Sequence, residues 1–295
     1  MQNNLERLGC SVNLFTLTKK IIFYTNPEEP YILWDGQYER PYWEPRPDFR
    51  KALDSAKQAE ISTIELGIDG AWLKSTALDH AKNAFKQVKK AGLRASSVHM
   101  PFATSHINLS AVDEEERLET IKYVKELFKI INKFDVDTVV FHPGGNSKDD
   151  PQKCMQSLIN SVKELKNETD AKICIENMVR STFFERADQV KNFLDAVDGG
   201  YTCVDVNHFL HDNPEDAILL YGNKIGAVHI SDNHRVNEEH IMPGEGLINW
   251  DKVVEAFNTV NYKGQINYET SMKKFGYTFE DVKNNYKKIF KNINK

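Results

Sequence analysis

Residues 201–231 read YTCVDVNHFLHDNPEDAILLYGNKIGAVHIS. The runs 201–207 and 225–231 are apolar and too short for buried helices, so each predicts a β-strand. Residues 214–222 lie between them and are plausible as a helix. A helix that connects two such strands is typical of a parallel sheet with right-handed crossovers. This stretch therefore predicts one strand–helix–strand unit of an α/β fold.

The same alternation extends through the rest of the chain. Six further strand-like runs occupy residues 8–15, 61–67, 94–100, 136–142, 171–177 and 264–270. Further helices are predicted over residues 48–60, 78–91, 113–131, 151–167, 185–196, 250–260 and 278–292. Eight strand–helix units in 295 residues favour a closed (β/α)8 TIM barrel over an open doubly wound sheet. We expect residues 1–295 to form this single domain.

The predicted helix at 113–131 shows the pattern most clearly. Asp113 is a candidate N-cap, with Glu116 three residues further on. Apolar side chains recur at helical spacing and predict one buried face, formed by Leu118, Ile121, Val124, Phe128 and Ile131.

Composition and charge argue against several classes of protein. Lys and Arg total 38 against 43 Asp and Glu, a formal net charge of −5. Such a chain lacks the broad basic surface usual in nucleic-acid-binding proteins, so a nucleic-acid partner is not expected. No run approaches the roughly 18–20 apolar residues of a membrane helix, and no signal-peptide pattern opens the chain. We expect a soluble cytoplasmic protein without a membrane partner; the sequence leaves a homo-oligomer open.

Residues 21–47 interrupt the strand–helix rhythm. This segment contains seven aromatic residues and five of the ten prolines. It forms a long connection after the first strand, and such connections lie at the ligand-binding face of a barrel. Two interpretations stay open: a loop packed on the barrel rim, or a lid whose aromatic side chains, Trp34 among them, contact a ring-shaped ligand.

Acidic and imidazole side chains stand at the carboxyl ends of the predicted strands. In a barrel these positions converge on one cavity. Neutral imidazole and carboxylate together bind a divalent cation well, because the cation offsets the repulsion between carboxylates. A single such residue is as easily explained by a structural hydrogen bond, but the series predicts a metal site. Its members are Glu65, His99, His142, Glu176, Asp205, His208, His229, Glu238, His240 and Glu269.

Seven strings carry a family resemblance, in this order: SSVHMPF, VVFHPGG, CIENM, CVDVNHF, VHISDN, EEHIMPGEGLINW and NYET. Together they resemble the xylose isomerase-like TIM-barrel superfamily over roughly residues 60–270. That superfamily includes sugar isomerases and epimerases and the endonuclease IV type of abasic-site nuclease. The first 50 residues match it less well.

The epimerase-type members imply a site with one divalent metal, Mn²⁺ or Zn²⁺, with Mg²⁺ or Co²⁺ as alternatives. The resemblance assigns the ligands to Glu176, Asp205, His229 and Glu269. Glu176 and Glu269 would also exchange the proton on a carbon beside a carbonyl, through a metal-stabilised enediolate.

Three further positions would contact the carbohydrate substrate. The resemblance implies His208 and Arg235, and Glu65 is a weaker candidate for a hydroxyl contact. Thr182 stands where the ketohexose 3-epimerase subgroup has Glu, which is a departure from that subgroup.

The nuclease type implies an alternative function, a zinc phosphodiesterase that acts on abasic DNA. It holds three zinc ions, and its additional ligand positions match His99, His142, His208 and His240, with Glu238 in place of Asp. A non-catalytic barrel that binds a sugar or a partner subunit is a third class. The intact ligand set favours an enzyme over that class.

Overall fold

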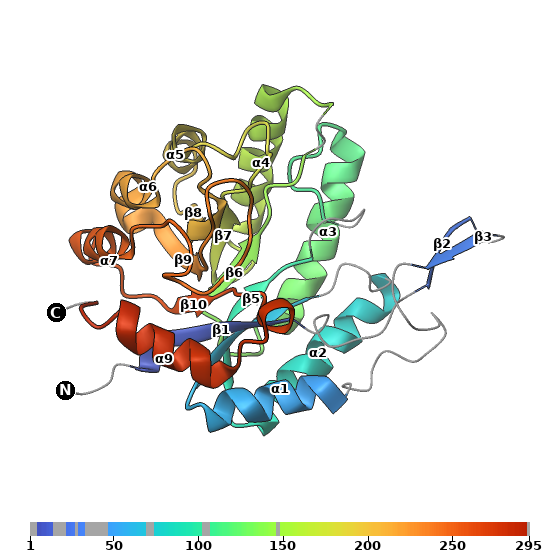
Figure 1. Cartoon of the computed structure of the whole chain (residues 1–295). Coiled ribbons are helices and arrows are strands. Elements are labelled where there is room, and N and C mark those ends of the chain that lie inside the picture. Colours follow the sequence, from blue (N-terminus) through green and yellow to red (C-terminus); the bar gives the residue numbers. More distant parts are fainter. Residues whose placement is uncertain are drawn as a thin grey trace.

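The computed structural model describes residues 5–13, 22–26, 29–32, 47–68, 74–101, 107–145 and 148–293. Eight parallel strands close into a barrel in the order β1-β10-β9-β8-β7-β6-β5-β4 (Figure 1). The strands are β1 (Leu8–Asn13), β4 (Thr63–Gly67), β5 (Arg94–His99), β6 (Thr138–Phe141), β7 (Lys172–Glu176), β8 (Tyr201–Asp205), β9 (Ile225–Ile230) and β10 (Ile266–Tyr268). Closure comes from β1, which pairs with both β4 and β10. The predicted TIM barrel is confirmed.

Helices surround the barrel and follow the strands in the predicted alternation (Figure 1). They are α1 (Pro47–Gln58), α2 (Lys74–Lys90), α3 (Glu114–Ile131), α4 (Pro151–Leu165), α5 (Ala187–Ala196), α6 (Pro214–Tyr221), α7 (Trp250–Thr259), α8 (Met272–Phe275) and α9 (Phe279–Ile289). The four-residue α8 was not predicted. Within the described part of the chain, none of these helices is long and apolar enough to cross a membrane.

The predicted N-cap of helix α3 is confirmed, but its predicted buried face is wrong at one residue. The Asp113 side chain accepts a hydrogen bond from the Glu116 backbone N–H at 2.9 Å. Leu118, however, is 47% exposed, so its prediction as a core residue was wrong. Arg117 is buried instead, because its guanidinium pairs with Glu114 on the same helix and with Glu164 on α4. The neighbouring helix thus replaces solvent around a charged group.

The connection after β1 contains a two-stranded antiparallel sheet of β2 (Ile22–Asn26) and β3 (Glu29–Ile32). The sequence predicted a long connection here and no strands. Trp34 lies outside the described residues, so its role as a substrate contact stays a prediction.

The barrel's register sets the position of the site. β7 ends at Glu176, β8 ends at Asp205, and Glu269 directly follows β10. Asp205 pairs with His229 in the ladder between β8 and β9. Because all eight strands run in parallel, their carboxyl ends lie at the same mouth of the barrel. Side chains that are up to 93 positions apart in the chain, from Glu176 to Glu269, therefore meet there.

Candidate metal centre

Four side chains surround one point at the carboxyl-terminal mouth: Glu176, Asp205, His229 and Glu269. Nδ1 of His229 lies 2.9 Å from Oε1 of Glu176 and 3.1 Å from Oε2 of Glu269. The same nitrogen lies 3.9 Å from Oδ2 of Asp205. One ligand atom from each side chain lies within 4.8 Å of all the others. The structure brings together the four residues that the resemblance assigned as ligands.

Two oxygens of this group are buried without a hydrogen bond. They are Oδ2 of Asp205 and Oε2 of Glu269, and both lie near imidazole nitrogens without hydrogen-bond geometry. A buried acceptor without a partner costs about 1–3 kcal/mol, and more when it is charged. A divalent cation at the centre of the group would satisfy both oxygens at once, so the residues present fit a metal ion.

The charges in the group point the same way. Burial and the nearby charges of Glu269 and Glu176 raise the pKa of Asp205 well above its usual range. Burial lowers the pKa of His229, but the acidic groups around its ring outweigh burial and raise that pKa well above its usual value. In the metal-free site, a proton on Asp205 thus removes one negative charge, and a proton on His229 adds a positive one. A bound cation would replace them, and metal binding would release protons.

A second group shares Glu176 with the first. Nε2 of His99 and Nε2 of His142 each lie 3.3 Å from Oε2 of Glu176. The other oxygen, Oε1, faces His229. Burial lowers the pKa of His99, but the hydrogen bond and charge of Glu176 outweigh it and raise that pKa to about 9. Glu176 therefore belongs to both candidate ligand groups, with one oxygen directed toward each.

The other predicted residues of this mouth, His208, Glu238 and His240, lie further apart. Nδ1 of His208 donates to the Asn177 carbonyl at 2.8 Å, which directs Nε2 toward Asp205 Oδ2 at 3.3 Å and Glu238 Oε2 at 3.6 Å. His240 lies with its ring centroid 5.9 Å from that of His208. Glu238 also forms an ion pair with Arg180. Among the described residues, His208, Glu238 and His240 do not form a tight ligand group like the first two.

Arg235 and Glu65 were predicted to contact the substrate. Nη1 of Arg235 donates to the carbonyls of Phe209 and Asp212, at 3.1 and 2.7 Å, in the loop after β8. Its substrate contact remains a prediction. Glu65 contacts Nε2 of His229, the ring nitrogen opposite the one that faces Glu176 and Glu269, so its contacts favour a supporting role over a contact with a substrate hydroxyl.

Sequence reasoning missed two polar residues that shape this mouth. The Asn177 side chain donates to the Asp205 carbonyl at 3.0 Å and accepts from the Asp205 N–H at 2.8 Å, which ties β7 to β8. Asp232, which is fully buried, accepts from three backbone N–H groups and the Trp250 indole. The sequence offered one signal for each: Asn177 directly follows the predicted ligand Glu176, and Asp232 directly follows the predicted strand 225–231.

Known proteins resemble this chain in sequence or in fold. An uncharacterized protein of Methanocaldococcus jannaschii is 30% identical over 209 residues, which cover 69% of this chain and 80% of the relative. A D-psicose 3-epimerase from Clostridium cellulolyticum H10, solved with D-tagatose, has a TM-score of 0.66 and 16% identity, covering 86% of this chain and 95% of that one. An L-ribulose 3-epimerase has a TM-score of 0.66 and 14% identity, covering 96% and 94%. At these identities the two solved structures show a shared fold.

The family comparison covers most of the barrel. The model of the xylose isomerase-like TIM barrel matches residues 53–292, which include both ligand groups. The chain belongs to the xylose isomerase-like TIM-barrel family.

Proposed function

We propose that this protein is a divalent-metal-dependent isomerase or epimerase of a sugar or sugar-like substrate. The observation that carries the proposal is the convergence of Glu176, Asp205, His229 and Glu269 within 4.8 Å, with two buried carboxylate oxygens that have no hydrogen-bond partner. Mn²⁺ or Zn²⁺ is the proposed ion, because both accept mixed carboxylate and imidazole ligands. The neighbours of known activity, D-psicose 3-epimerase and L-ribulose 3-epimerase, support a carbohydrate substrate.

The four ligands would hold the ion, and two of them would also move protons. The ion would supply electrostatic stabilisation for negative charge that develops on substrate oxygens. Glu176 and Glu269 would take the proton from a carbon beside the carbonyl and return it, since both reach the same point from different strands. Glu269 suits proton exchange with a substrate, because its side chain is 29% exposed whereas that of Glu176 is 1% exposed.

The exposed fractions also indicate where substrate enters. The side chains of His142, Glu238 and Glu269 are 24%, 26% and 29% exposed, while Asp205 and His229 are fully buried. Substrate would approach over the three partly exposed groups. His208, with Nε2 directed toward this side, and Arg235 would orient substrate oxygens. The exposed Thr182, in place of Glu, separates this chain from the ketohexose 3-epimerase pattern and favours a different sugar.

A second candidate function is hydrolysis of a phosphodiester in abasic DNA. The observation that favours it is the His99–His142–Glu176 group beside the first, because sites with two metal ions are typical of enzymes that cleave phosphodiesters. The net charge of −5 weighs against it. Nicking of an abasic duplex by the Zn²⁺-loaded protein, lost in His142→Ala, would favour this function over the first.

The deciding experiment combines metal analysis with proton exchange. The protein is purified without chelator, its metal content is measured, and keto- and aldo-sugars are incubated with it in deuterated water. We expect a bound divalent ion and deuterium incorporation beside the carbonyl of at least one sugar. Glu176→Gln should abolish exchange, whereas Glu255→Gln, the same change at an exposed position on α7, should not. Exchange by a protein shown to be free of metal would refute the proposal.

A further inference from the structure

A layer of hydrogen-bonded polar side chains lies inside the barrel, where branched apolar residues normally dominate. Thr138 donates to Ser97 at 2.9 Å, and Ser97 donates to Glu65 at 2.7 Å. From the other side, Asn267 donates to Ser11 at 2.9 Å, and Ser11 donates to Glu65 at 3.1 Å. Two chains of hydrogen bonds, from four other strands, thus end on one carboxylate.

The remaining contact of this carboxylate is His229. Oε1 and Oε2 of Glu65 lie 3.0 and 3.1 Å from Nε2 of His229. The opposite ring nitrogen, Nδ1, faces Glu176 and Glu269. Since an ionised carboxylate only accepts hydrogen bonds, Glu65 requires a proton on Nε2. The Nδ1 lone pair is then the one that can bind an ion.

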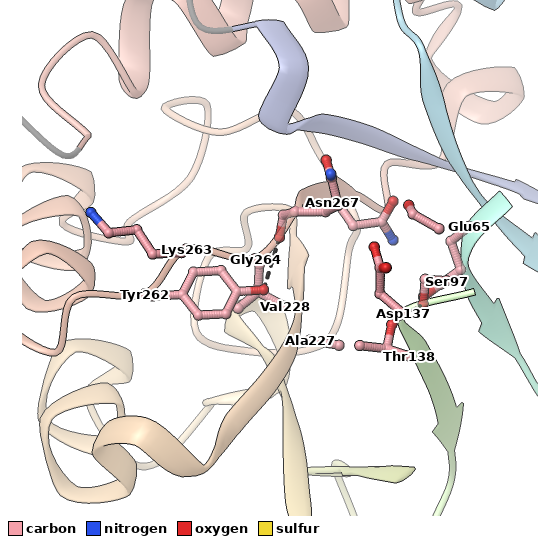
Figure 2. Close-up of a pocket in the computed structure, with 12 residues that line it drawn as sticks. Glu65, Ser97, Asp137, Thr138, Ala227, Val228, Tyr262, Lys263, Gly264 and Asn267 are labelled. Carbon is pink, nitrogen blue, oxygen red and sulfur yellow. Dashed lines mark hydrogen bonds between the residues drawn. The ribbon is translucent and has the colours of Figure 1, made fainter. Parts of the chain in front are cut away.

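The hydrogen bonds of the layer suit an ionised Glu65. Both serine hydroxyl groups that reach it, those of Ser11 and Ser97, donate to its oxygens, and an ionised carboxylate only accepts. A pocket of about 100 Å³ reaches the layer from the amino-terminal end of the barrel, and Figure 2 shows Glu65, Ser97, Thr138 and Asn267 in its lining. This volume is sufficient for several water molecules.

We propose that Glu65 is a positioning residue of the metal centre: it fixes the ring orientation and the Nε2–H form of His229, so that Nδ1 is presented to the ion. This inference deepens the proposed function and rests on it for the metal. Metal-binding histidines commonly donate their second N–H to a carboxylate, and loss of that partner typically lowers metal affinity by about 10–100-fold.

The test compares Glu65→Gln with Asp137→Asn. Asp137 lines the same pocket, but its side chain is 53% exposed and pairs with Arg94, so its variant controls for the loss of one negative charge. Zn²⁺ affinity is measured by competition with a chelator. Imidazole ¹H–¹⁵N spectra, with His229→Asn for assignment, report the Nε2 proton with and without Zn²⁺.

We expect wild-type protein to show a slowly exchanging, downfield Nε2–H of His229 in both states. Glu65→Gln should lose or strongly shift this signal and bind Zn²⁺ about 10–100-fold more weakly, whereas Asp137→Asn should do neither. Wild-type protein without an Nε2–H, or an unchanged signal in Glu65→Gln, would overturn the positioning role even if affinity falls. Wild-type protein that shows the Glu65-dependent signal but binds no ion would refute the proposed function and leave the positioning of His229 standing.

Discussion

Asp205→Asn should make the metal-free protein more stable while it removes the metal. In the wild type, Oδ1 of Asp205 accepts from the Asn207 N–H at 2.7 Å, and an asparagine oxygen can keep that bond. The amide N–H₂ would replace the unpartnered Oδ2, which lies 3.3 Å from Nε2 of His208. That nitrogen can accept a hydrogen bond, because the His208 proton is on Nδ1, where it donates to Asn177.

The difference in free energy of unfolding between wild type and variant depends on pH because the pKa of Asp205 is raised. The unfolded chain releases this proton near pH 4, whereas the folded metal-free protein keeps it. Wild-type stability therefore falls as pH rises from about 4 toward the folded pKa, by about 1.4 kcal/mol per pH unit. Asparagine has no proton to lose. The variant's advantage should be small, under about 1 kcal/mol, at pH 4.5 and should grow as the pH rises toward the raised pKa of the folded wild type.

Denaturant unfolding in the presence of a chelator measures this difference, with Asp170→Asn, at an exposed position, as the control. Added metal should reverse the order, because an ion that binds only the folded wild type stabilises it by about 4 kcal/mol at 1,000 times its Kd. If the metal-free variant is no more stable than wild type at pH 6.5, or if its advantage does not grow with pH, the reasoning from an uncompensated buried carboxyl fails.

Three further outcomes are expected. Glu269→Gln should lose most bound metal or most activity, measured by elemental analysis and proton exchange; full retention of both would contradict the assigned ligand set. Trp34→Ala should raise KM with little change in the unfolding midpoint, and an unchanged KM would leave residues 21–47 as rim packing. Asp232→Ala should lower the free energy of unfolding by about 3 kcal/mol or more, because its two oxygens accept four N–H groups. Asp232→Asn should cost less, and equal losses from the two variants would argue against these hydrogen bonds as the cause.

Apolar residues next to the proposed ligands accommodate the two buried carboxylate oxygens that lack a hydrogen-bond partner. The apolar residues that precede each strand-end ligand, such as Val204 before Asp205 and Val228 before His229, are fully or almost fully buried. These apolar side chains pack in the core, while the next residue of each strand directs a charged or imidazole side chain toward the mouth of the barrel. Core packing and the proposed metal ligands thus reside on successive residues of the same strands.

Local patterns were sufficient for the order of elements. The eight apolar runs, their intervening helices and the cap at Asp113 depend on neighbours a few residues away, so the sequence predicted them and the structure confirmed them. The hairpin of β2 and β3 escaped prediction because it lies in a segment rich in aromatics and prolines, where no clear alternation separates strand from loop. On α3, Ile121, Val124, Phe128 and Ile131 are buried as predicted. Leu118 was misplaced because the first turn buries Arg117 instead, and its ion pairs with Glu114 and Glu164 are not visible in the spacing of apolar residues.

The sequence by itself determined the alternation of strands and helices and the acidic or imidazole residue near the end of every strand after the first, since both are properties of short segments. Tertiary structure alone decided which atoms face one another. Glu65 on β4 and His229 on β9 belong to strands that are not neighbours in the barrel, and they meet across its interior. That contact depends on barrel closure and on the direction in which each side chain points, and neither leaves a signal in the spacing of residues along the chain.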